Sequence, residues 1–266
     1  MLRTIKGVAF ATYKEWAAYR SHMLVSLFVG PLYFLVQYYI WSSVYTGQDL
    51  INGFSLIQML TYYGITTLIN YCIMDFAGWN LQMLIRTGRF ITFMLRPVSH
   101  RLFAFSQKIG HRMLGFCLEL LPVYLVFTIA FDIHLIPANI LWSILSIFLG
   151  FMMMFLVNYC IGITGFWLTR TDGIRSIILL FRDVFAGVFI PLTFFPELLQ
   201  KILFFLPFQY ISYVPVRVFI GDYQLGGMEF TIAQIVGIQA IYVIMMLLLS
   251  ELMWRKGIKK FTGVGA

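Results

Sequence analysis

The chain alternates between long apolar segments and short polar connections. Each apolar segment is near or above the ~20 residues that a helix needs to cross ~30 Å of hydrocarbon. The pattern therefore predicts an all-α polytopic integral membrane protein, built as a single membrane domain over residues 1–266. Its six transmembrane helices are expected at residues 23–45, 56–78, 113–131, 138–168, 174–195 and 230–253.

The segment before the first apolar stretch has a different pattern. Its apolar residues recur at helical spacing, and its basic residues fall between them. Such a pattern predicts an amphipathic helix within residues 1–22 that lies in the membrane interface, with its apolar face toward lipid. A disordered basic tail is the alternative. The apolar positions are Leu2, Ile5, Ala9, Tyr13 and Trp16, and the basic ones are Arg3, Lys6, Lys14 and Arg20.

Residues 191–225, which precede the last apolar segment, contain prolines too often for one uninterrupted helix. The apolar pieces between the prolines are too short to cross a membrane. We expect short re-entrant or interfacial helices on the outer side, because broken backbone is tolerated at depth only where protein or water satisfies its polar groups. The prolines are Pro191, Pro196, Pro207 and Pro215.

Basic residues are distributed very unevenly among the connections. Of the 19 Lys and Arg residues, all but Lys201 and Arg217 lie at the two termini or within residues 79–112 and 169–182. Basic residues in short loops favour the cytosolic side, so we expect both termini in the cytosol and the protein in the cell (cytoplasmic or inner) membrane. The net charge of +8 is dispersed between apolar spans, which indicates attraction to the lipid bilayer rather than to nucleic acid.

Sequence motifs of common enzymes are absent. The chain has no G-x-x-x-x-G-K-[ST] segment, so it lacks a P-loop for nucleotide phosphates. It also lacks H-E-x-x-H, G-x-S-x-G and a paired-aspartate motif, and Cys72, Cys117 and Cys160 do not have metal-ligand spacing. We therefore expect a non-catalytic chain that binds no metal or cofactor of its own.

Among the ionisable residues inside the predicted spans, four stand out: Arg182, Asp183, Glu119 and Asp75. Each costs about 2.5–3.5 kcal/mol at a helix centre, so each needs a partner or a function. Arg182 and Asp183 are adjacent and point about 100° apart on a helix, so we expect them not to neutralise each other simply. They form either a structural pair with another span or part of a substrate path. For Glu119 and Asp75 we expect pairing with the basic segment 79–112.

Two further polar patterns lie near the predicted cytosolic face. Glu251 precedes Arg255 by four residues, which predicts an ion pair on a helix surface. In residues 86–112, Gly88 can end a helix, a short apolar helix over 90–95 follows, and Pro97 stops it. An amphipathic turn of this kind can dock into a groove on a soluble partner, although an ordinary interfacial hairpin is the alternative.

Several short motifs, taken in order, resemble a known family. The chain is similar to the membrane subunits of type-2 ATP-binding-cassette exporters, and among them to half-size permeases of the viologen and multidrug export kind. The match covers essentially the full length. It rests on Y-K-E-W-x-x-Y-R at 13–20, G-x-x-x-x-x-x-L-R-P at 88–97, G-x-x-x-P-L-x-x-F-P at 187–196, L-P-F-x-Y at 206–210 and the basic tail at 255–266.

The resemblance implies an ATP-driven export permease. It implies six spans, an interface helix and re-entrant helices, with a second permease, identical or paralogous, completing the translocation path. Two copies of a cytosolic ATPase subunit would bind ATP and Mg, and residues 86–97 would contact that subunit. The coupling residues implied are Gly88, Arg89, Phe90, Phe93, Leu95, Arg96 and Pro97.

Two other classes of function were weighed. An ion-gradient-driven secondary transporter would use Asp75, Glu119 or Asp183 as proton carriers, but it favours an internal repeat. Residues 23–131 and 138–253 show no convincing similarity. An intramembrane enzyme lacks its catalytic pairs. The role of Arg182 and Asp183 belongs to no motif of the family.

Overall fold

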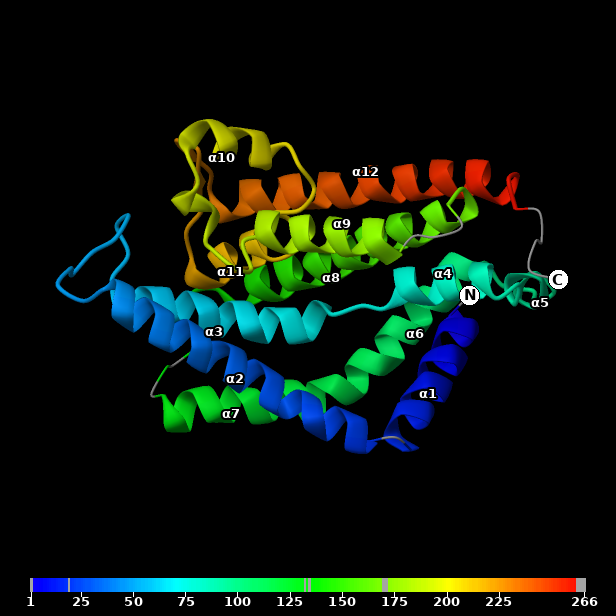
Figure 1. Ribbon diagram of the computed structural model, residues 1–266, viewed down its shortest axis with the longest axis horizontal. Coiled ribbons are helices and arrows are strands. Elements are labelled where there is room, and N and C mark those ends of the chain that lie inside the picture. Colours follow the sequence, from blue (N-terminus) through cyan, green and yellow to red (C-terminus); the bar gives the residue numbers. More distant parts are fainter. Residues whose placement is uncertain (1, 19, 132, 134, 169–171, 262–266) are drawn as a thin grey trace.

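A computed structural model of the chain describes residues 2–18, 20–131, 133, 135–168 and 172–261 (Figure 1). Its regular structure is helical apart from one short antiparallel hairpin, formed by β1 and β2. The elements are α1 Leu2–Ala18, α2 Arg20–Val44, α3 Leu56–Ile73, α4 Ala77–Arg86, α5 Phe90–Met94, α6 His100–Gly115, η1 Phe116–Leu120, α7 Leu121–Ala130, α8 Ile140–Ile163, η2 Thr164–Phe166, α9 Asp172–Phe185, η3 Leu192–Phe194, α10 Glu197–Phe204, α11 Tyr213–Ile220, β1 Gln224–Leu225, β2 Met228–Glu229 and α12 Ile232–Ile258.

Four helices of the described chain are long and apolar enough to cross a membrane. They cover Leu27–Val44, His100–Ile129, Ile140–Phe166 and Ile232–Ile258. The predicted class, a helical polytopic membrane protein, is therefore confirmed. In Figure 1, α2, α3 with α4, α6 with α7, α8, α9 and α12 run alternately in opposite directions along the long axis. The first turn of α1 and the last turn of α12 lie toward the same end of that axis.

The second predicted span, 56–78, is not one continuous helix. α3 ends at Ile73, the backbone at Met74 is extended (φ −45°, ψ 141°), and α4 begins at Ala77. The break places Gly78 directly against α8, where a Cβ atom on Gly78 would lie 2.2 Å from the carbonyl oxygen of Asn158. Contact between α4 and α8, which the apolar pattern cannot reveal, therefore sets the helix boundary.

The fifth predicted span, 174–195, is also wrong as a continuous helix, because α9 ends at Phe185. The three consecutive carbonyls of residues 187–189 accept hydrogen bonds from tyrosine hydroxyls of α2 and α3 instead of helical N–H groups. Tyr62 binds the first carbonyl at 2.6 Å, Tyr33 the second at 3.1 Å and Tyr63 the third at 2.7 Å. Gly187 has φ +75°, a left-handed conformation that favours glycine. With 14 residues, α9 is only about 21 Å long.

The third predicted span begins earlier than its apolar pattern indicates. α6 starts at His100 and continues through the π-helical turn η1 into α7, so the 79–112 segment is not simply a connection. As a result Lys108 and Arg112 lie inside the bundle, with only 5% and 7% of their surfaces exposed. The prediction that Lys108 and Arg112 are exposed charges that set the topology is therefore corrected.

The N-terminal helix is confirmed, but its expected orientation is not. Ala9 and Thr12 of α1 are buried, and the α1 backbone approaches α6 so closely that a Cβ on Gly110 would lie 2.1 Å from the Ala9 carbonyl oxygen. The Trp16 ring meets the His111 ring edge to face at 4.1 Å. The inner face of α1 therefore packs on protein rather than facing lipid.

The proline-rich segment does break into short helices. Pro191 precedes η3, Pro196 caps the start of α10, Pro207 follows α10, and Pro215 lies in the first turn of α11, where its missing N–H does no harm. The hairpin β1–β2 then leads into α12, and its turn contains Gly226 and Gly227, both with positive φ. The depth of this segment in the membrane stays a prediction.

Candidate coupling surface and buried polar network

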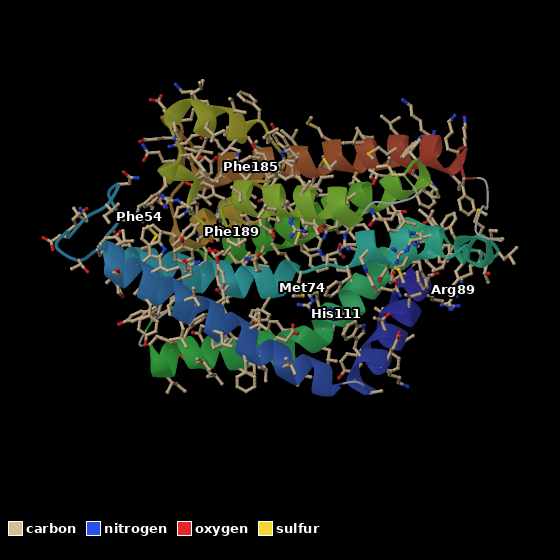
Figure 2. The ribbon with its side chains drawn as sticks, viewed as in Figure 1. Phe54, Met74, Arg89, His111, Phe185 and Phe189 are labelled. Atoms are coloured by element: carbon tan, nitrogen blue, oxygen red, sulfur yellow. The ribbon has the colours of Figure 1, made fainter. Side chains whose placement is uncertain are left out.

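The short helix α5 lies at one end of the long axis of the molecule (Figures 1 and 2). As predicted, α4 ends two residues before Gly88, whose φ of +70° turns the chain, and Pro97 follows α5 closely. The structure divides the predicted coupling residues into two groups. Phe90 and Phe93 are buried, with 1% and 6% exposure, whereas Arg89, Leu95, Arg96 and Pro97 are exposed.

The buried side of α5 is held by an aromatic cluster. The Phe90 ring lies 5.3 Å from Phe166 after α8, 5.9 Å from Trp254 of α12 and 5.2 Å from Phe261. The Phe93 ring lies 4.8 Å from the His100 ring at the start of α6. The start of α6, the turn η2 that follows α8 and the end of α12 therefore all pack against α5.

The exposed side of α5 is an apolar patch with basic residues beside it. Ile91, Met94 and Leu95 are 43%, 46% and 82% exposed, and Arg89 and Arg96 flank them. We call these five residues the α5 tip. Ile91 and Met94 were missed from sequence, because every position of this five-residue helix except Thr92 is apolar and only its packing shows which side faces out.

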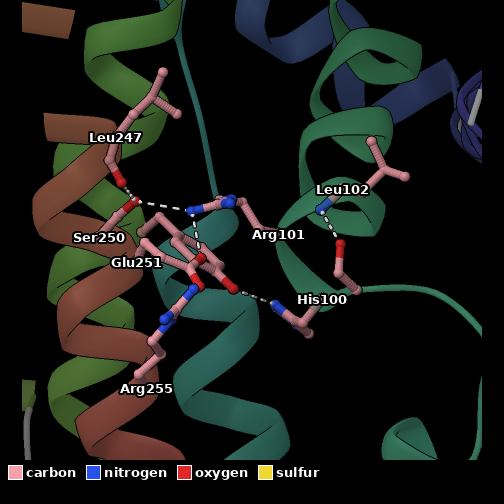
Figure 3. A network of polar contacts seen from close by, with 9 residues as sticks. His100, Arg101, Leu102, Leu247, Ser250, Glu251 and Arg255 are labelled. Atoms are coloured by element: carbon pink, nitrogen blue, oxygen red, sulfur yellow. Dashed lines mark hydrogen bonds and ion pairs between the residues drawn. The ribbon is translucent and has the colours of Figure 1, made fainter. Parts of the chain in front are cut away.

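Polar contacts fasten α6 to α12 close to the aromatic cluster (Figure 3). The predicted pair is confirmed, with Arg255 Nε 2.7 Å from Glu251 Oε1. Glu251 also accepts Arg101 Nη1 of α6 at 3.1 Å, and the same Arg101 nitrogen lies 3.4 Å from the Ser250 hydroxyl. Glu251, predicted to pair within its own helix, therefore also links α12 to α6.

A second polar network links α9 to α8 and to the break between α3 and α4. Arg182 Nη2 and Nε contact Asp183 Oδ1 at 2.6 and 2.8 Å, so the adjacent pair does neutralise itself, contrary to expectation. Arg182 Nη1 donates to Asn158 Oδ1 at 2.9 Å, and Asn158 Nδ2 donates to Asp75 Oδ2 at 3.1 Å. The long Arg182 side chain can turn back toward its neighbour while still reaching α8.

The Asp75 carboxylate accepts hydrogen bonds from N–H groups, and no described basic side chain forms an ion pair with it. Its carboxylate accepts from the Ala77 backbone N–H at 3.2 Å as well as from Asn158. The expected ion pair with the 79–112 segment is not formed among the described residues. Lys108 Nζ instead donates to the Phe151 carbonyl at 2.7 Å and lies 3.9 Å from the centre of the Phe151 ring.

Glu119 has the basic partner that was expected. Arg112 Nη1 lies 3.1 Å from Glu119 Oε2, and the side chains are only 7% and 4% exposed. The same nitrogen donates to the Tyr71 carbonyl of α3 at 2.6 Å, and Arg112 Nε donates to His111 Nδ1 at 3.1 Å. Glu119 lies within the π-helical turn η1, seven positions after Arg112 in the sequence.

The opposite end of the molecule carries its own buried polar contacts. Arg217 of α11, 8% exposed at its side chain, pairs with Asp222 at 2.5 Å. The Tyr223 hydroxyl donates to Gln209 Oε1 at 2.7 Å. Burial raises the pKa of Tyr213 to about 12 and that of Tyr223 still further, so both hydroxyls stay protonated donors.

These features define a multi-pass helical membrane protein with paired internal charges and an exposed apolar tip at one end. Residues 32–265 match the family model described as ABC-2 family transporter protein. The chain therefore belongs to that family and is an ABC-type membrane permease. Comparison with curated proteins and with solved structures gave no match.

Proposed function

We propose that the chain is the permease subunit of an ATP-driven exporter and that the α5 tip receives a separate cytosolic ATPase. The observation that carries this proposal is the two-sidedness of α5. Its outer side exposes Leu95 by 82%, while Phe90 on its inner side is almost fully buried among three long helices. A helix that is apolar on both sides, with only one side covered, suits a partner that supplies the other half of the contact.

In this proposal the chain crosses the membrane six times and keeps both termini in the cytosol of a cell (cytoplasmic or inner) membrane. The alternating direction of the long elements, with the start of α1 and the end of α12 at the same end, supports that topology. Two such permeases, identical or paralogous, would flank the path, and two ATPase subunits beneath them would bind ATP and Mg. The permease itself would carry no catalytic group.

The packing suggests how force would travel from the α5 tip. Phe90 and Phe93 pass motion of α5 to the ends of α6, α8 and α12. Gly78 and Gly162 bring α4 and α8 into backbone contact, since a Cβ on Gly162 would lie 2.8 Å from the Gly78 Cα. From α8, Asn158 reaches Arg182 on α9. The intramembrane charges thus serve as links between helices in this proposal, and Asp183, 31% exposed, is the one that could also face the path.

A paired substitution tests the role of the α5 tip. Leu95→Asp places a charge on the proposed contact. Leu198→Asp is the matched control, because Leu198 is 73% exposed and belongs to α10, which lies toward the opposite end (Figure 1). Both permeases are purified and reconstituted with the ATPase that copurifies with the full-length protein. We expect Leu95→Asp to abolish ATPase binding and stimulation, and Leu198→Asp to retain both. Equal behaviour of the two variants would contradict the proposal.

The same preparation tests the gradient-driven alternative. Asp75, Glu119 and Asp183 are each bound by an arginine, an amide or a main-chain N–H, which favours a structural role over proton carriage. We expect transport into proteoliposomes to stop when the ATPase or its ATP is left out. Transport that continues under an ion gradient without ATPase would replace the proposed function with the alternative.

A further inference from the structure

The C-terminal basic tail is a sequence motif that the coupling surface described above does not account for. We define the tail segment as residues 255–261; residues 262–266 of the motif lie outside the described chain. Two of its residues are packed. Gly257 is buried so tightly that a Cβ atom would lie 2.7 Å from Phe166 Cδ2, and the Phe261 ring lies 5.2 Å from Phe90 and 5.9 Å from Phe166.

The packing of Gly257 and Phe261 fixes the tail segment beside α5. Phe90 is the first residue of α5 and adjoins the exposed Ile91, so the residue that anchors the tail also anchors the α5 tip. Lys256, directly before Gly257, is exposed, and so are Lys259 and Lys260, which lie between the two packed positions. The motif R-K-G-I-K-K-F thus alternates residues that hold the segment in place with residues that project charge from it.

Among the described residues, the lysines of the tail segment have no acidic partner in an ion pair. Glu251, the nearest carboxylate along α12, is already bound by Arg101 and Arg255. Lys256, Lys259 and Lys260 form no ion pair within the part of the chain that the structure describes. Basic residues held together repel one another, and an acidic surface placed against them removes that repulsion.

Geometry favours a protein over lipid as the source of that acidic surface. α12 has 27 residues, so it is about 40 Å long and exceeds ~30 Å of hydrocarbon by more than one turn. An α12 centred in the bilayer would place the tail segment in the headgroup layer or beyond it. α5 lies at the same end of the molecule (Figure 1), and its tip exposes apolar side chains. In the same placement they would stand outside the acyl chains.

We propose that the tail segment and the α5 tip form one docking surface, and that the ATPase meets it with an apolar groove bordered by acidic side chains. This inference rests on the proposed function. The α5 tip supplies the apolar contact, and Lys256, Lys259 and Lys260 supply a basic rim that steers the partner and fixes its orientation. Rim charges of this kind act mainly on association rate and on salt dependence.

Charge-neutral variants of the full-length permease test the inference. The tail variant is Lys256→Gln/Lys259→Gln/Lys260→Gln. The matched control, Arg3→Gln/Lys6→Gln/Lys14→Gln, removes the same charge from exposed positions of α1. Each permease is placed in nanodiscs of phosphatidylcholine alone, or of phosphatidylcholine with phosphatidylglycerol. Binding of the copurifying ATPase is then measured at increasing salt concentration.

We expect the tail variant to bind the ATPase about tenfold more weakly at low salt in phosphatidylcholine, with a shallower salt dependence than the wild-type permease, while the α1 control matches the wild type. Equal affinity of tail variant and wild type in phosphatidylcholine would overturn the inference. A difference that appears only with phosphatidylglycerol would also overturn it and would assign the lysines to lipid. If the wild type itself binds no ATPase, the proposed function fails, and the inference fails with it.

Discussion

The buried pair of Arg112 and Glu119 gives the sharpest test of the internal packing. Arg112→Met removes the guanidinium but keeps a long apolar side chain of similar reach. The substitution takes the Arg112 guanidinium away from the Glu119 carboxylate, whose side chain is 4% exposed, and it removes the N–H that binds the Tyr71 carbonyl at 2.6 Å. The perturbation therefore affects α3, α6 and η1 together.

The expected cost follows from this geometry. Loss of one partner of a buried ion pair costs about 3–5 kcal/mol, because the other charge stays buried and loses its opposite charge. When both partners are replaced by apolar residues, the charge penalty disappears, and what remains is mainly the lost bond to the Tyr71 carbonyl, about 1 kcal/mol. Arg112→Met should thus destabilise the protein much more than Arg112→Met/Glu119→Met.

Unfolding in mixed dodecylmaltoside and SDS micelles, followed by the fluorescence of the six tryptophans, measures these differences. A double-mutant cycle with Glu119→Met isolates the interaction between the two side chains. We expect a coupling energy of at least about 2 kcal/mol. A single variant that loses less than about 1 kcal/mol, or a double variant as unstable as the sum of both singles, would refute the reasoning.

Further predictions concern close contacts and an exposed pair. Tyr62→Phe should cost about 1–3 kcal/mol, because it leaves the Gly187 carbonyl buried without a donor; faster amide exchange around residues 186–190 would show it, and unchanged exchange would contradict it. Gly78→Ala should destabilise by about 1–3 kcal/mol or more, since its Cβ would meet the Asn158 carbonyl oxygen at 2.2 Å; the same micelle assay measures it, with Gly7→Ala on open surface as the control. Glu251→Gln should change stability by less than about 1 kcal/mol, because its ion pairs are partly solvent-exposed. A larger loss of stability in the micelle assay would contradict this and show that the link from α6 to α12 stabilises the protein more than its exposure indicates.

Local patterns predicted local structure well. The bounds of α5, the breaks at Pro196 and Pro207 and the i,i+4 pair of Glu251 all depend on residues within one or two helical turns of each other. The same reasoning failed for the predicted spans at 56–78 and 174–195. Both are apolar enough to continue as helices, and both end where residues far along the chain bind the backbone or pack against it.

The candidate site divides along the same line. The sequence located the α5 segment, but it placed Phe90 and Phe93 on the docking side, whereas packing against Phe166, Trp254 and Phe261 turns them inward. Neither could the sequence assign Lys108 to the interior. A lysine near the end of a predicted span is normally interpreted as a charge that sets the topology. Only the structure shows that Lys108 donates to the Phe151 carbonyl of α8.

The amino-acid sequence by itself determined that this chain is a helical, multi-pass membrane protein, because apolar length and basic loop residues act locally and additively. Its resemblance to ABC-2 permeases came from the order of short motifs. Only the tertiary structure decided where helices stop and which charges are paired. Those outcomes depend on contacts such as that of Tyr62 with Gly187, separated by 125 positions. A buried carbonyl or carboxylate takes whichever donor the packed helices bring within reach, and no periodicity in the sequence encodes that choice.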